Sequence, residues 1–287
     1  MKPMPDSSDA DLRDLRDLVD PVVVLAFGGW NDAGNAATGA VEHLDDAYDA
    51  EPVFALDPDD YYDFQVNRPQ VELNDDDDRV ISWPTTEFKL AELPDGRDLI
   101  LVLGLEPNLR WRQFSTVIVS ALRSANVTRV HLLGALLADT PHTRPVPVSV
   151  STGDRELMKQ LGLAPSTYEG PTGIVGVLAD SLQRAGIEVL MLWAAVPHYV
   201  SHPPCPKGTL ALLSQLEQVL DYSIDLGELP ELARAWERGV DELAAEDTEV
   251  AEYVTSLEQQ QDAAELPEAS GDAIAAEFER YLRRRQS

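Results

Sequence analysis

The densest group of side chains that could do chemistry lies in one loop, A-D-T-P-H-T-R-P-V-P at residues 138–147. Asp139, His142 and Arg144 bring a carboxylate, an imidazole and a guanidinium together, and three prolines stiffen the loop around them. Such a set suits general acid–base catalysis or a charge-complementary contact. No serine or cysteine nucleophile with a recognisable elbow accompanies it. An internal Asp–Arg pair in a proline-rich connection is therefore the favoured interpretation.

A second charged loop, E-P-N-L-R-W-R-Q-F at residues 106–114, supplies Glu106, Arg110 and Arg112. The two arginines are two residues apart, so they point in different directions on a helix. One can face a ligand or partner while the other fixes a neighbouring carboxylate, and the sequence leaves both roles open.

A third loop, G-G-W-N-D-A-G-N at residues 28–35, joins a strand-like run to a helical pattern and contains Trp30, Asn31 and Asp32. It matches neither the dinucleotide nor the P-loop phosphate motif, and it has no lysine. The helix that follows it could hold an anion at its N-terminus. Capping of that helix by Asn31 or Asp32 is the favoured role for one of them.

Two further segments add polar side chains. V-P-H-Y-V-S-H-P-P at residues 196–204 contains His198, and Y-E-G-P-T-G at residues 168–173 contains Glu169 and Thr172. His198 and His202 would share a helix face with metal-ligand spacing, but the surrounding prolines forbid a helix there. We therefore predict no metal site and no cofactor.

Strand-like apolar runs precede these loops, at residues 22–27, 99–103, 130–133 and 189–195. In an open parallel sheet, ligands bind in the crevice outside the carboxyl ends of the strands. The sequence thus predicts one rim of candidate ligand- or partner-binding residues. Its members are Trp30, Asn31, Asp32, Glu106, Arg110, Arg112, Asp139, His142, Arg144, Glu169, Thr172 and His198.

The periodicity predicts an α/β fold, a three-layer α/β/α sandwich with a mostly parallel central sheet and a C-terminal α-helical extension. Residues 57–97 break the pattern, and they are interpreted as a hairpin appended to the sheet. The expected strands are 22–27, 52–56, 80–82, 86–91, 99–103, 129–135, 146–150 and 188–195. The expected helices are 33–46, 109–124, 154–161, 173–185 and 207–222.

Changes in composition divide the chain into three parts. Residues 1–20 are expected to be a lead-in helix or disordered, residues 21–225 the α/β/α domain, and residues 228–287 an acidic helical domain. Three helical stripes mark that last part. They are Leu232, Trp236, Val240 and Leu243; Val250, Tyr253, Val254 and Leu257; and Ile274, Phe278, Tyr281 and Leu282.

The net charge of −29 argues against nucleic acid and against anionic membrane surfaces, because both need clustered lysine and arginine. The single cysteine, Cys205, excludes an intramolecular disulfide framework. The longest apolar run, residues 189–196, is far shorter than the roughly 20 residues that span a bilayer. The N-terminus lacks the apolar stretch of a secretory signal, so a cytoplasmic protein is expected.

Six motifs, in order, resemble the proteasome assembly chaperone 2 family, and most closely its actinobacterial branch. The resemblance spans roughly residues 21–225, and the acidic helical tail corresponds to an addition of that branch. The motifs are G-W-N-D-A-G, F-Q-V-N-R-P, G-L-E-P-N-L-R-W-R-Q-F, L-L-A-D-T-P-H-T-R-P-V-P, Y-E-G-P-T-G-I-V-G and W-A-A-V-P-H-Y.

The resemblance implies a sandwich similar to purine nucleoside phosphorylases and related hydrolases. Eukaryotic and archaeal members assist assembly of the proteasome α-ring, so proteasome α subunits are the implied partner. Several members form homo-oligomers and the actinobacterial relatives look trimeric, so the resemblance implies a homo-oligomer here, with a trimer favoured. Some archaeal relatives dock through a terminal hydrophobic-Tyr-X tail. This chain ends in Y-L-R-R-R-Q-S, which places Tyr281 too far from the terminus for that mode.

Three functional hypotheses follow. The favoured one is a non-enzymatic, assembly-chaperone-like interaction protein. The alternative is a small-molecule binder or a phosphorylase- or hydrolase-like enzyme of nucleoside or phosphate type, using Glu106, Asp139, His142 and Arg144. The third is a structural oligomer whose acidic tail packs against its neighbours.

Overall fold

The computed structural model describes residues 15, 17–74, 77–200 and 202–265. A seven-stranded sheet forms the centre, in the order β2-β5-β6-β1-β7-β9-β8. Strands β6, β1, β7 and β9 pair in parallel, whereas β5 and β8 pair antiparallel with their neighbours. Strand β2 is antiparallel to β5 and so runs with the central four. The bounds are β1 Val22–Gly28, β2 Glu51–Ala55, β5 Thr86–Glu92, β6 Asp98–Leu105, β7 Arg129–Ala138, β8 Val148–Ser151 and β9 Glu188–Pro197.

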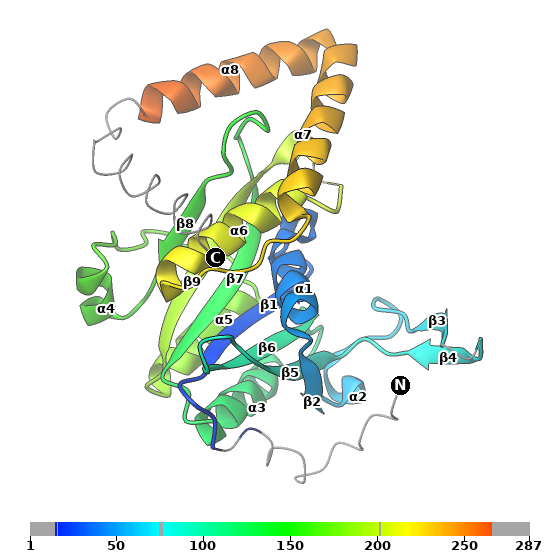
Figure 1. Cartoon of the computed structure of the whole chain (residues 1–287), viewed down its shortest axis with the longest axis vertical. Helices are drawn as coiled ribbons and strands as arrows, with labels where there is room; N and C mark the ends of the chain where they lie inside the picture. The colour runs from blue at the N-terminus through cyan, green and yellow to red at the C-terminus, as the bar shows by residue number, and fades with distance from the viewer. Residues whose placement is uncertain (1–14, 16, 75–76, 201, 266–287) are drawn as a thin grey trace.

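The central strands are apolar on both faces because helices cover both sides of the sheet (Figure 1). Every residue of β1 is buried, from Val22 to Gly28. One face packs on α1 and α6, and the other packs on α3 and α5. The bounds are α1 Ala36–Tyr48, α3 Trp111–Ser124, α5 Ile174–Arg184 and α6 Pro206–Leu220. This confirms the expected three-layer α/β/α sandwich with a mostly parallel sheet.

Residues 57–97 form more than the single appended hairpin that the sequence predicts. β3 (Gln70–Leu73) and β4 (Arg79–Ser82) do form a hairpin, in a two-stranded sheet of their own. In contrast, β5 lies inside the main sheet, between β2 and β6.

The short helices of the described residues are α2 Pro58–Tyr61 and α4 Arg155–Gln160, with 3-10 turns at Ala33–Asn35 and His198–Val200.

Up to residue 265, two helices follow the sandwich, α7 (Leu229–Glu246) and α8 (Thr248–Glu265), with Asp247 as the single residue between them. α7 packs on α6, and α8 turns away from it at an angle (Figure 1). Apart from residues 15 and 17–20, the expected lead-in lies outside the described residues. The stripe from Ile274 to Leu282 lies outside them as well.

The outer strands of the main sheet are short. β2 carries Pro52 and a register shift between Pro52 and Phe54, and β8 pairs with β9 over four residues. Within the described residues, no helix is both long and apolar enough to cross a membrane.

Candidate functional site

The four predicted loops follow the carboxyl ends of β1, β6, β7 and β9, which run in the same direction. They therefore emerge at one edge of the sheet. Hydrogen bonds divide their side chains into two groups at that edge. One group lies around Asn31, and the other lies against α7 and α8.

Asn31 is the centre of the first group and is almost fully buried. Its Nδ2 donates to Oε1 of Glu106 at 2.8 Å, and the same oxygen accepts from the backbone N–H of Ile174 at 2.8 Å. Glu106 therefore joins the loop after β1 to the N-terminus of α5, where a carboxylate is favoured. A Cβ at Gly173 would lie 2.1 Å from Asn31 Nδ2, so only glycine permits this close approach.

Asp32 caps helix α1. Its Oδ1 accepts from the backbone N–H of Ala37 at 2.7 Å, and its Oδ2 accepts from the backbone N–H of Thr38 at 3.3 Å and from the Thr38 hydroxyl. Burial raises the pKa of the Asp32 carboxyl above its usual value, although these hydrogen bonds lower it. The carboxylate is thus occupied by the start of its own helix.

His142 is the centre of the second group and is buried. Its backbone N–H donates to the Tyr199 hydroxyl at 2.8 Å, and the same oxygen lies 2.8 Å from the ring Nδ1. The ring Nε2 lies 3.1 Å from Oδ1 of Asp241 on α7. In the neutral ring, the hydroxyl donates to Nδ1 and the Nε2–H donates to Asp241. Burial raises the pKa of Tyr199 to about 12, so that its hydroxyl keeps its proton.

Arg144 connects the same loop to α8. Its Nε and Nη2 donate to the two carboxylate oxygens of Asp262 at 2.8 and 2.9 Å, and its Nη1 donates to Glu258 at 3.3 Å. These two parallel hydrogen bonds to Asp262 are bidentate, and this geometry makes an arginine–carboxylate contact strong and fixes its orientation. The Thr143 hydroxyl donates to Glu258 as well. The expected partner of Arg144 within its own loop, Asp139, is replaced by acids of α8.

Asp139 instead pairs with His198, and both contact α8. The Tyr253 hydroxyl donates to Oδ1 of Asp139 at 3.0 Å, and Nδ1 of His198 lies 3.3 Å from the same oxygen. The rings of His198, Tyr199 and Tyr253 meet edge to face, with centroids 5.5 to 6.0 Å apart. The loops after β7 and β9 are therefore fastened together beneath α8.

The remaining predicted residues join neither group. Trp30 is exposed. Arg110 precedes α3 in a left-handed backbone conformation, and its side chain forms an ion pair with Asp60. Within the described part of the chain, the exposed side chains of Arg112, Glu169 and Thr172 form no hydrogen bond or ion pair.

The second group also contains residues that sequence reasoning did not select: Tyr199, Asp241, Tyr253, Glu258 and Asp262. One signal was available, because Glu258 and Asp262 are four residues apart and share a helix face. Their pairing with a loop more than 110 residues earlier has no local signature.

The chemistry available to the two groups is limited, because their acids and bases bond to one another. Glu106 belongs to the first group, and Asp139, His142 and Arg144 belong to the second, so the four groups of the enzyme hypothesis do not share one centre. Among the described residues, no group of three or more His, Cys, Asp and Glu side chains is placed to hold a metal ion.

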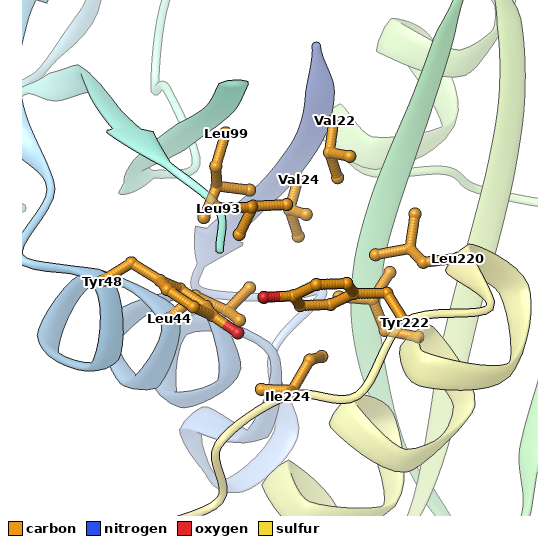
Figure 2. A pocket seen from close by; sticks show the side chains of 10 residues that line it. Val22, Val24, Leu44, Tyr48, Leu93, Leu99, Leu220, Tyr222 and Ile224 are labelled. Atoms are coloured by element: carbon orange, nitrogen blue, oxygen red, sulfur yellow. The ribbon is translucent and has the colours of Figure 1, made fainter. Parts of the chain in front are cut away.

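Figure 2 shows an apolar cavity away from this edge, near the amino ends of β1 and β6. Val22, the first residue of β1, and Leu99, the second residue of β6, lie in its wall. The hydroxyls of Tyr48 and Tyr222 point toward each other (Figure 2). The cavity holds about 10 Å³, roughly the least that admits one water molecule. It is too small for a nucleoside.

Residues 26–244 match the PAC2 family. A PAC2 family protein from Streptomyces avermitilis is 56% identical, with 82% of this chain and all of that chain covered and a TM-score of 0.77. The proteasome-assembly chaperone homologue of Mycobacterium tuberculosis is 50% identical, with 81% and 99% covered and a TM-score of 0.74.

The archaeal proteasome activator PbaB of Pyrococcus furiosus shares the fold at 19% identity, with 79% and 94% covered and a TM-score of 0.62. No protein of curated function matches the chain. The family match covers all of the sandwich except the start of β1, and it ends inside α7. The chain belongs to the PAC2 family.

Proposed function

We propose that this protein is a non-enzymatic interaction protein that acts in proteasome assembly by binding proteasome α subunits. The observation that carries the proposal is the 50% identity, over nearly the whole of the relative, to the mycobacterial proteasome-assembly chaperone homologue. A homo-oligomer in the cytoplasm, with a trimer favoured by the family resemblance, belongs to the same proposal.

The candidate site supports an interaction role over a catalytic one. A general acid or base needs to reach a substrate proton at hydrogen-bond distance. His142 is buried between Tyr199 and Asp241, and Arg144 is held by two carboxylates. These contacts position loops against helices, as a binding surface requires.

Native mass spectrometry with the proteasome α subunit of the same organism tests the proposal. The expected result is a complex of defined stoichiometry with the α subunit, and none with the β subunit, which serves as the matched control. Absence of an α-subunit complex from low micromolar to tens of micromolar protein would refute the proposal.

A thermal-shift series with nucleosides, nucleotides and inorganic phosphate tests the enzyme hypothesis separately. No shift in melting temperature is expected. A saturable shift with one ligand would favour small-molecule chemistry instead.

A further inference from the structure

Helix α8 lies outside the part of the chain that matches the family. The match ends at residue 244, whereas α8 begins at Thr248. The loop between β7 and β8 is inside the match, and α8 lies over it (Figure 1). Residues 139–145 of that loop are here called the covered loop. The family domain thus carries a surface that is covered by a helix from beyond the matched residues.

Few apolar contacts hold α8 in this place. Among its described side chains only Val254 and Leu257 are buried, and neither belongs to the two hydrophobic clusters that form the core of the sandwich. One residue, Asp247, joins α8 to α7. Segments with few buried apolar contacts open at a lower free energy than the core does. α8 can therefore leave the covered loop while the sandwich stays folded.

The contacts between α8 and the covered loop are largely polar and charged. Arg144 forms the bidentate pair with Asp262, and its Nη1 donates to Glu258 at 3.3 Å. The Thr140 hydroxyl donates to Oε1 of Gln261 at 3.3 Å. Contacts of this kind can be exchanged, because a carboxylate of another protein can form the same bidentate pair with an arginine.

The composition of α8 indicates which partner the covered loop fits. The two acids that reach Arg144 are four residues apart, so they share one face of the helix. The helix contains no lysine, arginine or histidine, and its acidic residues are Glu249, Glu252, Glu258, Asp262 and Glu265. The covered loop therefore fits an acidic helix, and α8 occupies the place of one.

We propose that the covered loop is a binding surface for an acidic helix of the proteasome α subunit, and that α8 is its intramolecular competitor. The inference rests on the proposed function, and it adds where the α subunit binds and how that binding is regulated. With α8 in place, the side chain of Arg144 is 32% exposed and its guanidinium is occupied. The apparent dissociation constant for the α subunit therefore rises as the fraction of chains with displaced α8 falls.

Two variants displace α8 and differ in whether Arg144 remains. Glu258→Ala/Asp262→Ala removes the acids of α8, and Arg144→Ala removes the guanidinium that they bind. Both should speed amide hydrogen exchange in α8 and leave exchange in the central strands unchanged. Glu242→Ala/Glu246→Ala on α7 is the matched control, because both acids are exposed, have the same spacing and form no ion pair within the described residues. This control should leave exchange in α8 at the wild-type rate.

Biolayer interferometry with the proteasome α subunit of the same organism then measures affinity. Glu258→Ala/Asp262→Ala should bind at least about fivefold more tightly than the wild type, the lower end of typical coupling between two sites. Arg144→Ala should bind at least about fivefold more weakly than Glu258→Ala/Asp262→Ala, because the guanidinium that pairs with the partner is missing. The control should keep the wild-type affinity. Binding of the α subunit to the wild type should also speed exchange in α8.

Faster exchange in α8 without a gain in affinity would overturn the inference and leave the proposed function standing. Equal affinity of the two displaced variants would overturn it as well, because Arg144 would then have no part in binding. Unchanged exchange in α8 in both variants would show that these contacts do not hold the helix, which also overturns the inference. Absence of a complex with the wild type and with every variant would instead refute the proposed function, and the inference with it.

Discussion

Acidification should destabilise this fold through one buried imidazole, that of His131 on β7. Its Nδ1 lies 3.0 Å from the carbonyl oxygen of Val23 and donates to it, while Nε2 is buried without a partner in the described part of the chain. Burial is the main cause that lowers the pKa of His131 to about 4, and the positive charges of Arg129 and Arg97 lower it further.

The direction of the pH effect on stability follows from comparing the protonation of His131 in the unfolded and the folded chain. The unfolded chain takes up a proton on this imidazole near pH 6.5, and the folded chain does so only near pH 4. Stability is therefore full above pH 6.5 and is lost as pH falls toward 4. Between pH 7 and pH 5 the loss amounts to about 2 kcal/mol, from 1.36 kcal/mol per pH unit below 6.5. Measurement at pH 5 also stays above the isoelectric point of 4.3.

Urea unfolding of the wild type and of His131→Leu at both pH values measures the effect. The substitution removes a hydrogen bond at either pH, which changes the unfolding free energy by the same amount at both. The titration of His131 is therefore measured by how much the difference in unfolding free energy between wild type and variant changes from pH 7 to pH 5. The wild type should lose about 2 kcal/mol more than the variant between pH 7 and pH 5. His202→Leu, at an exposed imidazole, is the matched control for the loss of a ring. Equal pH dependence of wild type and His131→Leu would refute the reasoning.

Three further substitutions probe the strand-end contacts. Arg144→Ala should speed hydrogen exchange in α8 while leaving exchange in the central strands unchanged; Arg155→Ala, at an exposed arginine without an ion pair in the described residues, should not. Asp32→Ala removes the cap of α1 and should cost about 1–2 kcal/mol in urea unfolding. Gly173→Ala should cost about 1–3 kcal/mol, because the new methyl group overlaps Asn31 and displaces α5.

Each of the three has a distinct contrary outcome. Unchanged exchange of α8 in Arg144→Ala would show that apolar contacts alone hold this helix. Equal stability of Asp32→Ala and wild type would exclude the capping role. A Gly173→Ala protein with wild-type stability would show that α5 can shift at no cost.

Local patterns were sufficient to predict the layers of the sandwich. Continuous apolar runs such as Val22–Gly28 mark strands that are buried on both faces, and the 3.6-residue periods mark the helices around them. The position of β5 inside the sheet was not predictable in this way. Strand order depends on contacts between segments far apart in the chain, and residues 86–91 have the same local pattern at an edge as in the middle.

The sequence was sufficient to predict where the candidate residues lie, but not which side chains they bond to. Strand direction put the four loops at one edge, and the expectation that Asn31 or Asp32 binds the start of the following helix is met by Asp32. Its carboxylate reaches Ala37 and Thr38 from outside the N-cap position, which Asn35 holds. The ties of Arg144 to Glu258 and Asp262 span 114 and 118 residues. These contacts depend on the direction that α8 takes after Asp247. The charge pattern of the loop or of α8 alone does not determine that direction.

The edges of the main sheet limit how another chain can join it. A strand added by backbone hydrogen bonds needs a long row of free N–H and C=O groups. β2 interrupts that row with Pro52, and β8 offers only four residues. The sandwich is thereby protected against edge-to-edge aggregation, and specificity for any associating protein rests on side-chain surfaces, where single substitutions can change the choice of partner without changing the fold.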